Sequence, residues 1–168
     1  SSSDLIINSY KKYINDELVS TTIYEIADTS VIRLTIDAGN QLTHKRIYIT
    51  GNSNLAVKCI DSIYNGQTLI TADLHLSYDN EYLVSIYKNW IQIGENPASG
   101  ESLETRIIEK ENILSVNKSA PGNPSGCTSH FNYTGLINKI DIQDFSNRWL
   151  GKINKNLVKH VSWNNGCP

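Results

Sequence analysis

The sequence has no methionine, only three cysteines and four prolines, and no long apolar run. No segment approaches the roughly 20 apolar residues that cross a bilayer as a helix, so no membrane span is predicted. The 15 basic and 17 acidic residues nearly cancel, which argues against a nucleic-acid-binding or polybasic membrane-surface protein. The nine tyrosines and three tryptophans exclude a disordered chain. A length of 168 residues favours a single domain.

The motifs of several enzyme classes are also missing. The sequence contains neither of the glycine-rich motifs that cradle phosphates, GxGxxG and GxxxxGK[ST], which argues against a nucleotide cofactor. HExxH and CxxC are absent, which argues against common zinc sites. A GxSxG elbow for a nucleophilic serine is absent too. We therefore expect no metal, no organic cofactor and no catalysis.

The first residues and the cysteines suggest an extracytoplasmic location. The chain begins with three serines, so we expect that a signal peptide, a lipoprotein leader or an N-terminal anchor has been removed. Cys127 and Cys167 lie in glycine-flanked segments typical of loops, whereas Cys59 lies in an apolar, strand-like run. These positions predict a Cys127–Cys167 disulfide and a buried free thiol at Cys59. A trimmed cytoplasmic domain with three reduced thiols is the alternative.

Alternation of apolar and polar residues predicts an antiparallel meander over 21–116. Ile32, Leu34 and Ile36, for example, alternate with polar residues and give one buried and one solvated face. Turn signals at Gly39-Asn40, Asn65-Gly66 and Asp79-Asn80 separate the runs. The predicted strands are 30–37, 42–50, 55–64, 67–78 and 82–93. Periodicity alone leaves open whether the meander curls toward a small barrel.

Helical spacing predicts one helix on each side of the meander. The apolar stripe of residues 4–18 is Ile6, Tyr10, Tyr13, Ile14 and Leu18. A second stripe, over 141–157, is Ile142, Phe145, Trp149, Ile153 and Leu157. Within 130–168 a short terminal strand through Val158, Val161 and Trp163 follows that helix. The expected fold is therefore α+β, with both helices covering the sheet.

Three groups of chemically active residues have an ordinary structural interpretation. Cys127 and His130 are three apart, a spacing that does not aim a thiolate at an imidazole. Asp73 and His75 share one strand face and could hold a metal with His44, but a solvated polar face is the simpler interpretation. The last group, Glu101, Glu104, Glu109 and Glu111, alternates with basic residues and indicates a charged edge strand.

The segment 117–129, rich in proline and glycine, is the predicted recognition loop. Pro121 and Pro124 restrict its backbone, so the loop would lose little entropy on binding. Phe131 and Tyr133 follow it and offer apolar contacts of the kind that anchor interfaces. We therefore predict that Pro121, Pro124, Phe131 and Tyr133 bind the partner. The alternative is that 117–129 only connects two parts of the chain.

The expected plan of a leading helix, a meander and a cysteine-closed C-terminal region resembles that of pilin-like subunits, which implies a structural subunit of a surface fibre. Our leading prediction is a non-catalytic secreted, periplasmic or surface-anchored domain that binds another protein or a surface glycan. A small secreted hydrolase is a further alternative. A small-ligand carrier would require the sheet to enclose a cavity.

The predicted disulfide gives a direct test of the compartment. A Cys127–Cys167 bridge closes a loop of about 40 residues and should stabilise the fold by roughly 4 kcal/mol in the chain-entropy model. Thiol counting on protein unfolded without reductant should find one reactive group, that of Cys59. Three reactive groups in freshly isolated protein would contradict the bridge.

Overall fold

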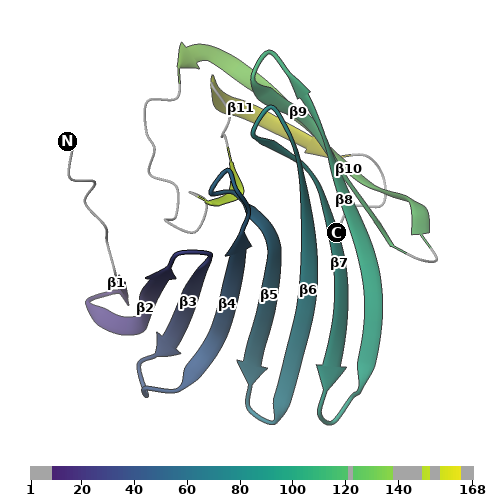
Figure 1. Cartoon of the computed structure of the whole chain (residues 1–168). Helices are drawn as coiled ribbons and strands as arrows, with labels where there is room; N and C mark the ends of the chain where they lie inside the picture. Colours follow the sequence, from purple (N-terminus) through teal and green to yellow (C-terminus); the bar gives the residue numbers. More distant parts are fainter. Residues whose placement is uncertain (1–8, 121–122, 138–148, 152–155, 164–168) are drawn as a thin grey trace.

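The computed structural model describes residues 9–120, 123–137, 149–151 and 156–163 (Figure 1). Eleven strands form one sheet, and each strand pairs antiparallel with its neighbours in the sequence. The strands are β1 (Ser9–Ile14), β2 (Glu17–Ala27), β3 (Ser30–Asp37), β4 (Leu42–Thr50), β5 (Ala56–Asn65), β6 (Thr68–Asp79), β7 (Tyr82–Ile93), β8 (Ala98–Glu109), β9 (Asn112–Ala120), β10 (Asn123–Ile137) and β11 (Asn156–Trp163). The predicted antiparallel meander is confirmed.

Tight turns with positive φ set the register of the meander. Asn40 (φ 62°) and Gly66 (φ 58°) occupy turns that the sequence predicts. Three further turns place two consecutive non-glycine residues at positive φ: Asn15-Asp16, Asn80-Glu81 and Lys110-Glu111. Two residues at positive φ form the hairpin turn whose twist matches that of the flanking strands. Because these turns are short, each strand pairs with the strands that precede and follow it in the sequence.

The predicted N-terminal helix is wrong. Within 4–18 the structure describes residues 9 onward, and β1 pairs with β2 across the Asn15-Asp16 turn. Tyr10, Tyr13 and Ile14 have the spacing of a helical stripe, but aromatic and β-branched residues also favour strands. Hydrogen bonding to β2 outweighs the weak helical preference of six residues.

The predicted C-terminal helix is wrong as well, so the fold is not α+β. Residues 149–150 form a short 3₁₀ turn that ends at Gly151 (φ 87°), and β11 begins at Asn156. No α-helix occurs in the described part of the chain, and accordingly no helix there could cross a membrane. The rest of 141–157 lies outside the described residues. The predicted terminal strand is confirmed by β11.

The predicted loop at 117–129 consists largely of strand. Residues 117–120 end β9, and β10 begins at Asn123 and contains Cys127. Cross-strand pairing of Cys127 with Lys118 explains the difference, because backbone hydrogen bonds extend the meander through the glycine- and proline-rich sequence. Cys59 is buried and free, as predicted. Cys167 lies outside the described residues, so its bridge with Cys127 stays a prediction.

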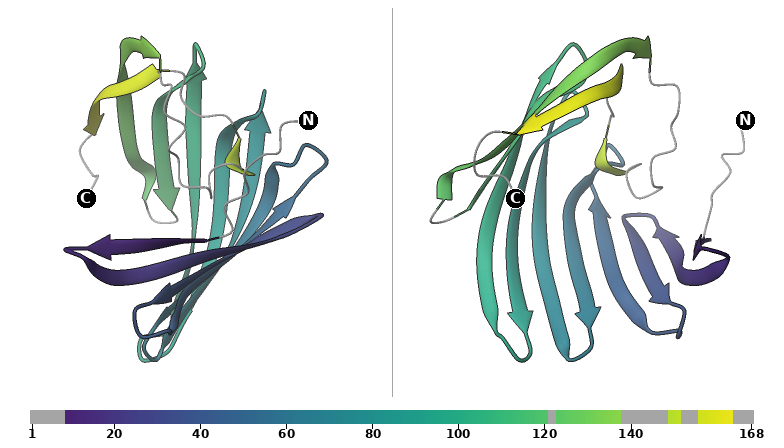
Figure 2. Two further views of the ribbon diagram at one scale, coloured as in Figure 1. Left: turned by 90° about the vertical axis from the view of Figure 1, so that its left-hand side faces the viewer. Right: turned by 180° about the vertical axis from the view of Figure 1, so that it is seen from behind.

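The sheet is strongly curled, and the segment around Trp149 lies inside the curve (Figure 2). We call the sheet face that carries Tyr24 and Tyr48 the inner face. The Trp149 ring lies 6.0 Å from the ring of Tyr24 and 5.8 Å from that of Tyr48, measured between centroids. Tyr48 is 0% exposed and Trp149 is 8% exposed. The core therefore forms where Trp149, which lies in the connection between β10 and β11, covers the inner face of the sheet.

One polar contact and one close backbone approach hold the segment that carries Trp149. The Tyr78 hydroxyl donates to the Ala56 carbonyl oxygen at 2.7 Å and lies 3.4 Å from that of Trp149. Gly151 passes the β6–β7 turn so closely that an added Cβ would lie 2.1 Å from the Glu81 carbonyl oxygen. No side chain other than hydrogen fits there. The predicted burial of Trp149 is thus confirmed, although a turn and not a helix presents it.

Truncation of Trp149 tests how much the stability of the fold depends on the packing of its ring on Tyr24 and Tyr48. Trp149→Ala should lower the free energy of unfolding by about 3–5 kcal/mol, because a large aromatic ring leaves a cavity between two tyrosines. Trp163→Ala is the control, since Trp163 is 64% exposed, and it should cost less than about 1 kcal/mol. Urea denaturation followed by circular dichroism measures both. Equal losses in the two variants would contradict the central role of Trp149.

Candidate functional site

A cavity of about 450 Å³ opens between two connections at one end of the sheet. One is the β2–β3 turn, which contributes Ala27 and Asp28, and the other is the β4–β5 loop, which contributes Ser53, Asn54 and Leu55. Cavities of 300–1,000 Å³ are typical of small-ligand sites. The two connections thus form the walls of a site of ligand size.

Backbone hydrogen bonds hold the two walls together. The Thr50 N–H donates to the Thr29 carbonyl oxygen at 3.0 Å, which ties the end of β4 to the β2–β3 turn. Within the β4–β5 loop, the Gly51 N–H donates to Leu55 at 2.9 Å and the Asn54 N–H donates to Gly51 at 3.1 Å. Asn54 adopts a left-handed conformation (φ 59°) that asparagine tolerates well. The loop is therefore a closed turn with a defined shape.

The cavity is lined by five apolar and four hydrogen-bonding residues. Trp149, whose ring packs on Tyr24 and Tyr48, is one of the apolar lining residues. The other apolar lining residues are Ile26, Ala27, Val31 and Leu55, and the polar ones are Asp28, Thr50, Ser53 and Asn54. A mixed lining of this kind gives a ligand both apolar contact and polar groups that fix its orientation.

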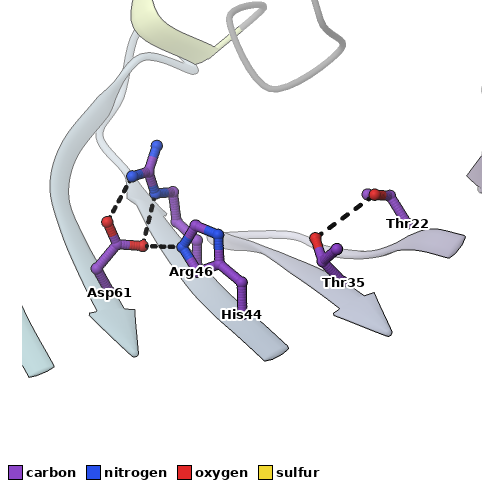
Figure 3. A network of polar contacts seen from close by, with 5 residues as sticks. All are labelled: Thr22, Thr35, His44, Arg46 and Asp61. Atoms are coloured by element: carbon purple, nitrogen blue, oxygen red, sulfur yellow. Dashed lines mark hydrogen bonds and ion pairs between the residues drawn. The ribbon is translucent and has the colours of Figure 1, made fainter. Parts of the chain in front are cut away.

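A buried ion cluster lies on the inner face across β4 and β5 (Figure 3). The Arg46 guanidinium binds both carboxylate oxygens of Asp61, with its Nε at 2.8 Å from Oδ1 and its second contact to Oδ2. His44 Nε2 lies 2.7 Å from the same Oδ1. The side chain of Asp61 is only 11% exposed. A two-pronged pair of this kind is the strongest arrangement for a partly buried carboxylate.

The pairing decides the charge state of Asp61. Burial alone would raise the pKa of its carboxyl, but hydrogen bonds from Arg46 and His44 outweigh burial and hold this pKa well below its usual range. The hydrogen bond to Asp61 in turn raises the pKa of Arg46. The carboxylate therefore stays ionised and fully engaged, which suits a structural role on the sheet better than proton transfer.

A second ion cluster lies farther along the inner face. Arg106 binds Glu104 at 2.7 Å, and the Lys118 ammonium lies 3.4 Å from the other oxygen of Glu104. The four glutamates are not assembled into one site, because Glu104 points inward while Glu101, three residues earlier on β8, lies on the opposite face. The predicted charged edge strand is wrong, because β8 pairs with both β7 and β9. In the described part of the chain no group of three His, Cys, Asp or Glu side chains is placed to hold a metal.

The other predicted constellations are also separated by the strand geometry. His44 lies on the inner face, whereas Asp73 and His75 lie on the outer face, where Lys58 binds Asp73 at 3.0 Å. Cys127 and His130 point to opposite faces of β10. Burial raises the pKa of the Cys59 thiol to about 12, which leaves it un-ionised. The interpretation of these groups as ordinary structural residues is consistent with their placement.

Of the predicted binding residues, Phe131 and Tyr133 do not line the cavity. Both lie half-buried in β10, and the Tyr133 hydroxyl donates to the Ile113 carbonyl oxygen at 2.5 Å. Pro124 is the second residue of the same strand, and Pro121 lies outside the described residues. Their role in binding stays a prediction. The cavity was not predicted from the sequence. The one signal for it was the connection Gly51–Leu55, which is longer than the tight turns that join most neighbouring strands.

Comparisons with protein-family models, curated proteins and solved structures found no match to this chain. The functional argument therefore depends on the residues themselves.

Replacing Asp61 tests the ion cluster. Asp61→Asn should lower the free energy of unfolding at pH 7 by about 3–5 kcal/mol, because Arg46 would remain buried without its counter-charge. Asp73→Asn is the control, since its pair with Lys58 is half-exposed, and should cost less than about 1 kcal/mol.

The pH dependence gives a second readout. The folded-state pKa of Asp61 lies below the unfolded value, so its stabilisation is complete above the unfolded pKa and is lost as pH falls toward the folded one. Urea denaturation from pH 7 to pH 3 should therefore show a smaller acid-induced loss in Asp61→Asn than in the wild type. Equal acid sensitivity would contradict the assignment.

Proposed function

We propose that this chain is a non-catalytic binding domain of the extracytoplasmic space, and that it binds its ligand in the cavity between the β2–β3 turn and the β4–β5 loop. The cavity of about 450 Å³, with its mixed apolar and polar lining, is the observation that carries the proposal. The location outside the cytoplasm follows from the predicted Cys127–Cys167 disulfide.

The state of the reactive side chains supports binding over catalysis. Asp61 is neutralised by Arg46, and the Cys59 thiol is buried and un-ionised. The polar residues of the cavity are one carboxylate, two hydroxyls and one amide, carried by Asp28, Thr50, Ser53 and Asn54. A lone carboxylate beside neutral groups suits recognition, because acid–base catalysis of hydrolysis usually uses a pair of titratable groups.

A mixed-compound NMR titration tests this function. Wild-type protein labelled with ¹⁵N is titrated with amino acids, simple amines, carboxylates, nucleosides and methyl glycosides. We expect at least one compound class to shift the amide signals of Asp28, Ser53 and Asn54, and the bound compound to be recovered chemically unchanged. Conversion of the compound would favour the hydrolase alternative instead.

Matched tryptophan variants give the control. Ser53→Trp fills the cavity from an exposed loop and should abolish the shifts, whereas Asn96→Trp, in the exposed β7–β8 connection, should preserve them. Shifts that persist in Ser53→Trp, or that gather on β7 to β9 in the wild type, would refute the cavity as the site.

A further inference from the structure

We infer that the cavity takes one uncharged sugar residue of a glycan. This inference rests on the proposed function and names its ligand class. It follows from three features of the lining: its hydrogen-bonding groups, its apolar wall and its charge.

The polar side of the cavity matches hydroxyl groups. A sugar hydroxyl donates one hydrogen bond and accepts others. The Asp28 carboxylate only accepts, the Asn54 amide both donates and accepts, and the Thr50 and Ser53 hydroxyls do either. The set thus offers acceptors and donors side by side, as several adjacent hydroxyls on one ring require. A ligand with donors alone, such as an ammonium group, would leave the donors of Asn54, Thr50 and Ser53 without partners.

The apolar side matches the C–H face of a sugar ring. Val31 and Trp149 form buried wall, while Ile26 is 48% exposed and stands at the edge of the cavity. A pyranose ring has an apolar face of C–H groups and an edge of hydroxyls, so it can satisfy both sides of the lining at once. Burial of its apolar face beside Ile26 and Trp149 would contribute in proportion to the area removed from water.

The charge of the described lining disfavours an acidic sugar. Among the described residues that line the cavity, Asp28 is the only charged one, and it repels an anionic ligand. The arginine of the inner-face cluster, Arg46, is occupied by Asp61 and does not line the cavity. The cavity is also open to solvent, so the remainder of a glycan chain can extend outward from the bound residue.

The test uses methyl glycosides of glucose, galactose and mannose as probes, with methyl glucuronide and choline as comparison ligands. Binding to the wild-type protein is followed by ¹⁵N NMR and by fluorescence of Trp149, with Trp149→Phe to assign the signal. We expect at least one neutral glycoside to shift the amides of Asp28, Ser53 and Asn54, and methyl glucuronide to bind at least tenfold more weakly.

Two charge-matched variants sharpen the test. Asp28→Asn should weaken binding of the neutral glycoside about tenfold or more, since hydrogen bonds to a charged acceptor are the strong ones. Asp79→Asn makes the same change at the exposed end of β6, outside the cavity, and should leave binding unchanged. Equal affinity in wild type and Asp28→Asn would overturn the assigned role of the carboxylate, and with it the inference.

The outcomes separate this inference from the proposed function. Choline shifts at the same amides with silent glycosides would overturn the sugar inference but leave the cavity a binding site. Tighter binding of methyl glucuronide than of its neutral counterpart would also overturn it. If no probe or library compound shifts these amides, both the inference and the proposed function fail.

Discussion

The fold depends on one contact, the packing of Trp149 on Tyr24 and Tyr48. A meander of consecutive hairpins pairs each strand with its neighbours and supplies a sheet but not the layer that must cover it. Trp149 comes from the chain between β10 and β11 and lies on strands β2 and β4, more than 100 residues earlier in the sequence. This long-range contact fixes the inner face as the buried one and the other face as the solvated one.

Burial of the inner face explains why Asp61 and Arg46 are paired. Asp61 and Arg46 face each other across β4 and β5, directly beside the aromatic cluster, and Arg46 lies 5.8 Å from the centre of the Tyr48 ring. A single charge in this position would lose its hydration without compensation. Reciprocal hydrogen bonds make the charges tolerable and fix the register of the two strands, because a shift by one residue would place Asp61 and Arg46 on opposite faces.

The meander could be predicted from the sequence because each hairpin is a local structure. Alternation in segments such as Ile32–Ile36, together with turn signals at Gly39-Asn40 and Asn65-Gly66, places strands within one or two residues of their observed bounds. The absence of the two predicted helices could not be inferred from local sequence in the same way. Tyr10, Tyr13 and Ile14 fit a helical stripe by spacing, but pairing with β2 across Asn15-Asp16 decides their structure, and that turn lacks the glycine that marks a hairpin.

The candidate site was harder to predict for a different physical reason. Asp28, Ser53 and Asn54 are ordinary turn residues in the sequence, and only the hydrogen bond from Thr50 to Thr29 brings the two connections together. The burial of Trp149 was predictable from its position in an apolar stripe, but its place in the lining of the cavity was not. Trp149, which is distant in the sequence, completes the lining of the cavity, and no local sequence pattern indicates which turns it lies beside.

The residues of the site differ in how strongly their substitution affects the stability of the fold. Trp149 and Val31 are buried, so changes there affect folding and binding together. Asp28 and Ser53 are exposed and lie in connections, where substitutions usually change stability by less than about 0.5 kcal/mol. Asn54 is also exposed, but its positive φ (59°) disfavours most other residues. The wall of the cavity is therefore constrained by the core, whereas Asp28 and Ser53 at its hydrogen-bonding rim are free to vary. Such an arrangement permits the ligand preference to change through the two connections while the curled sheet and its aromatic cover stay the same.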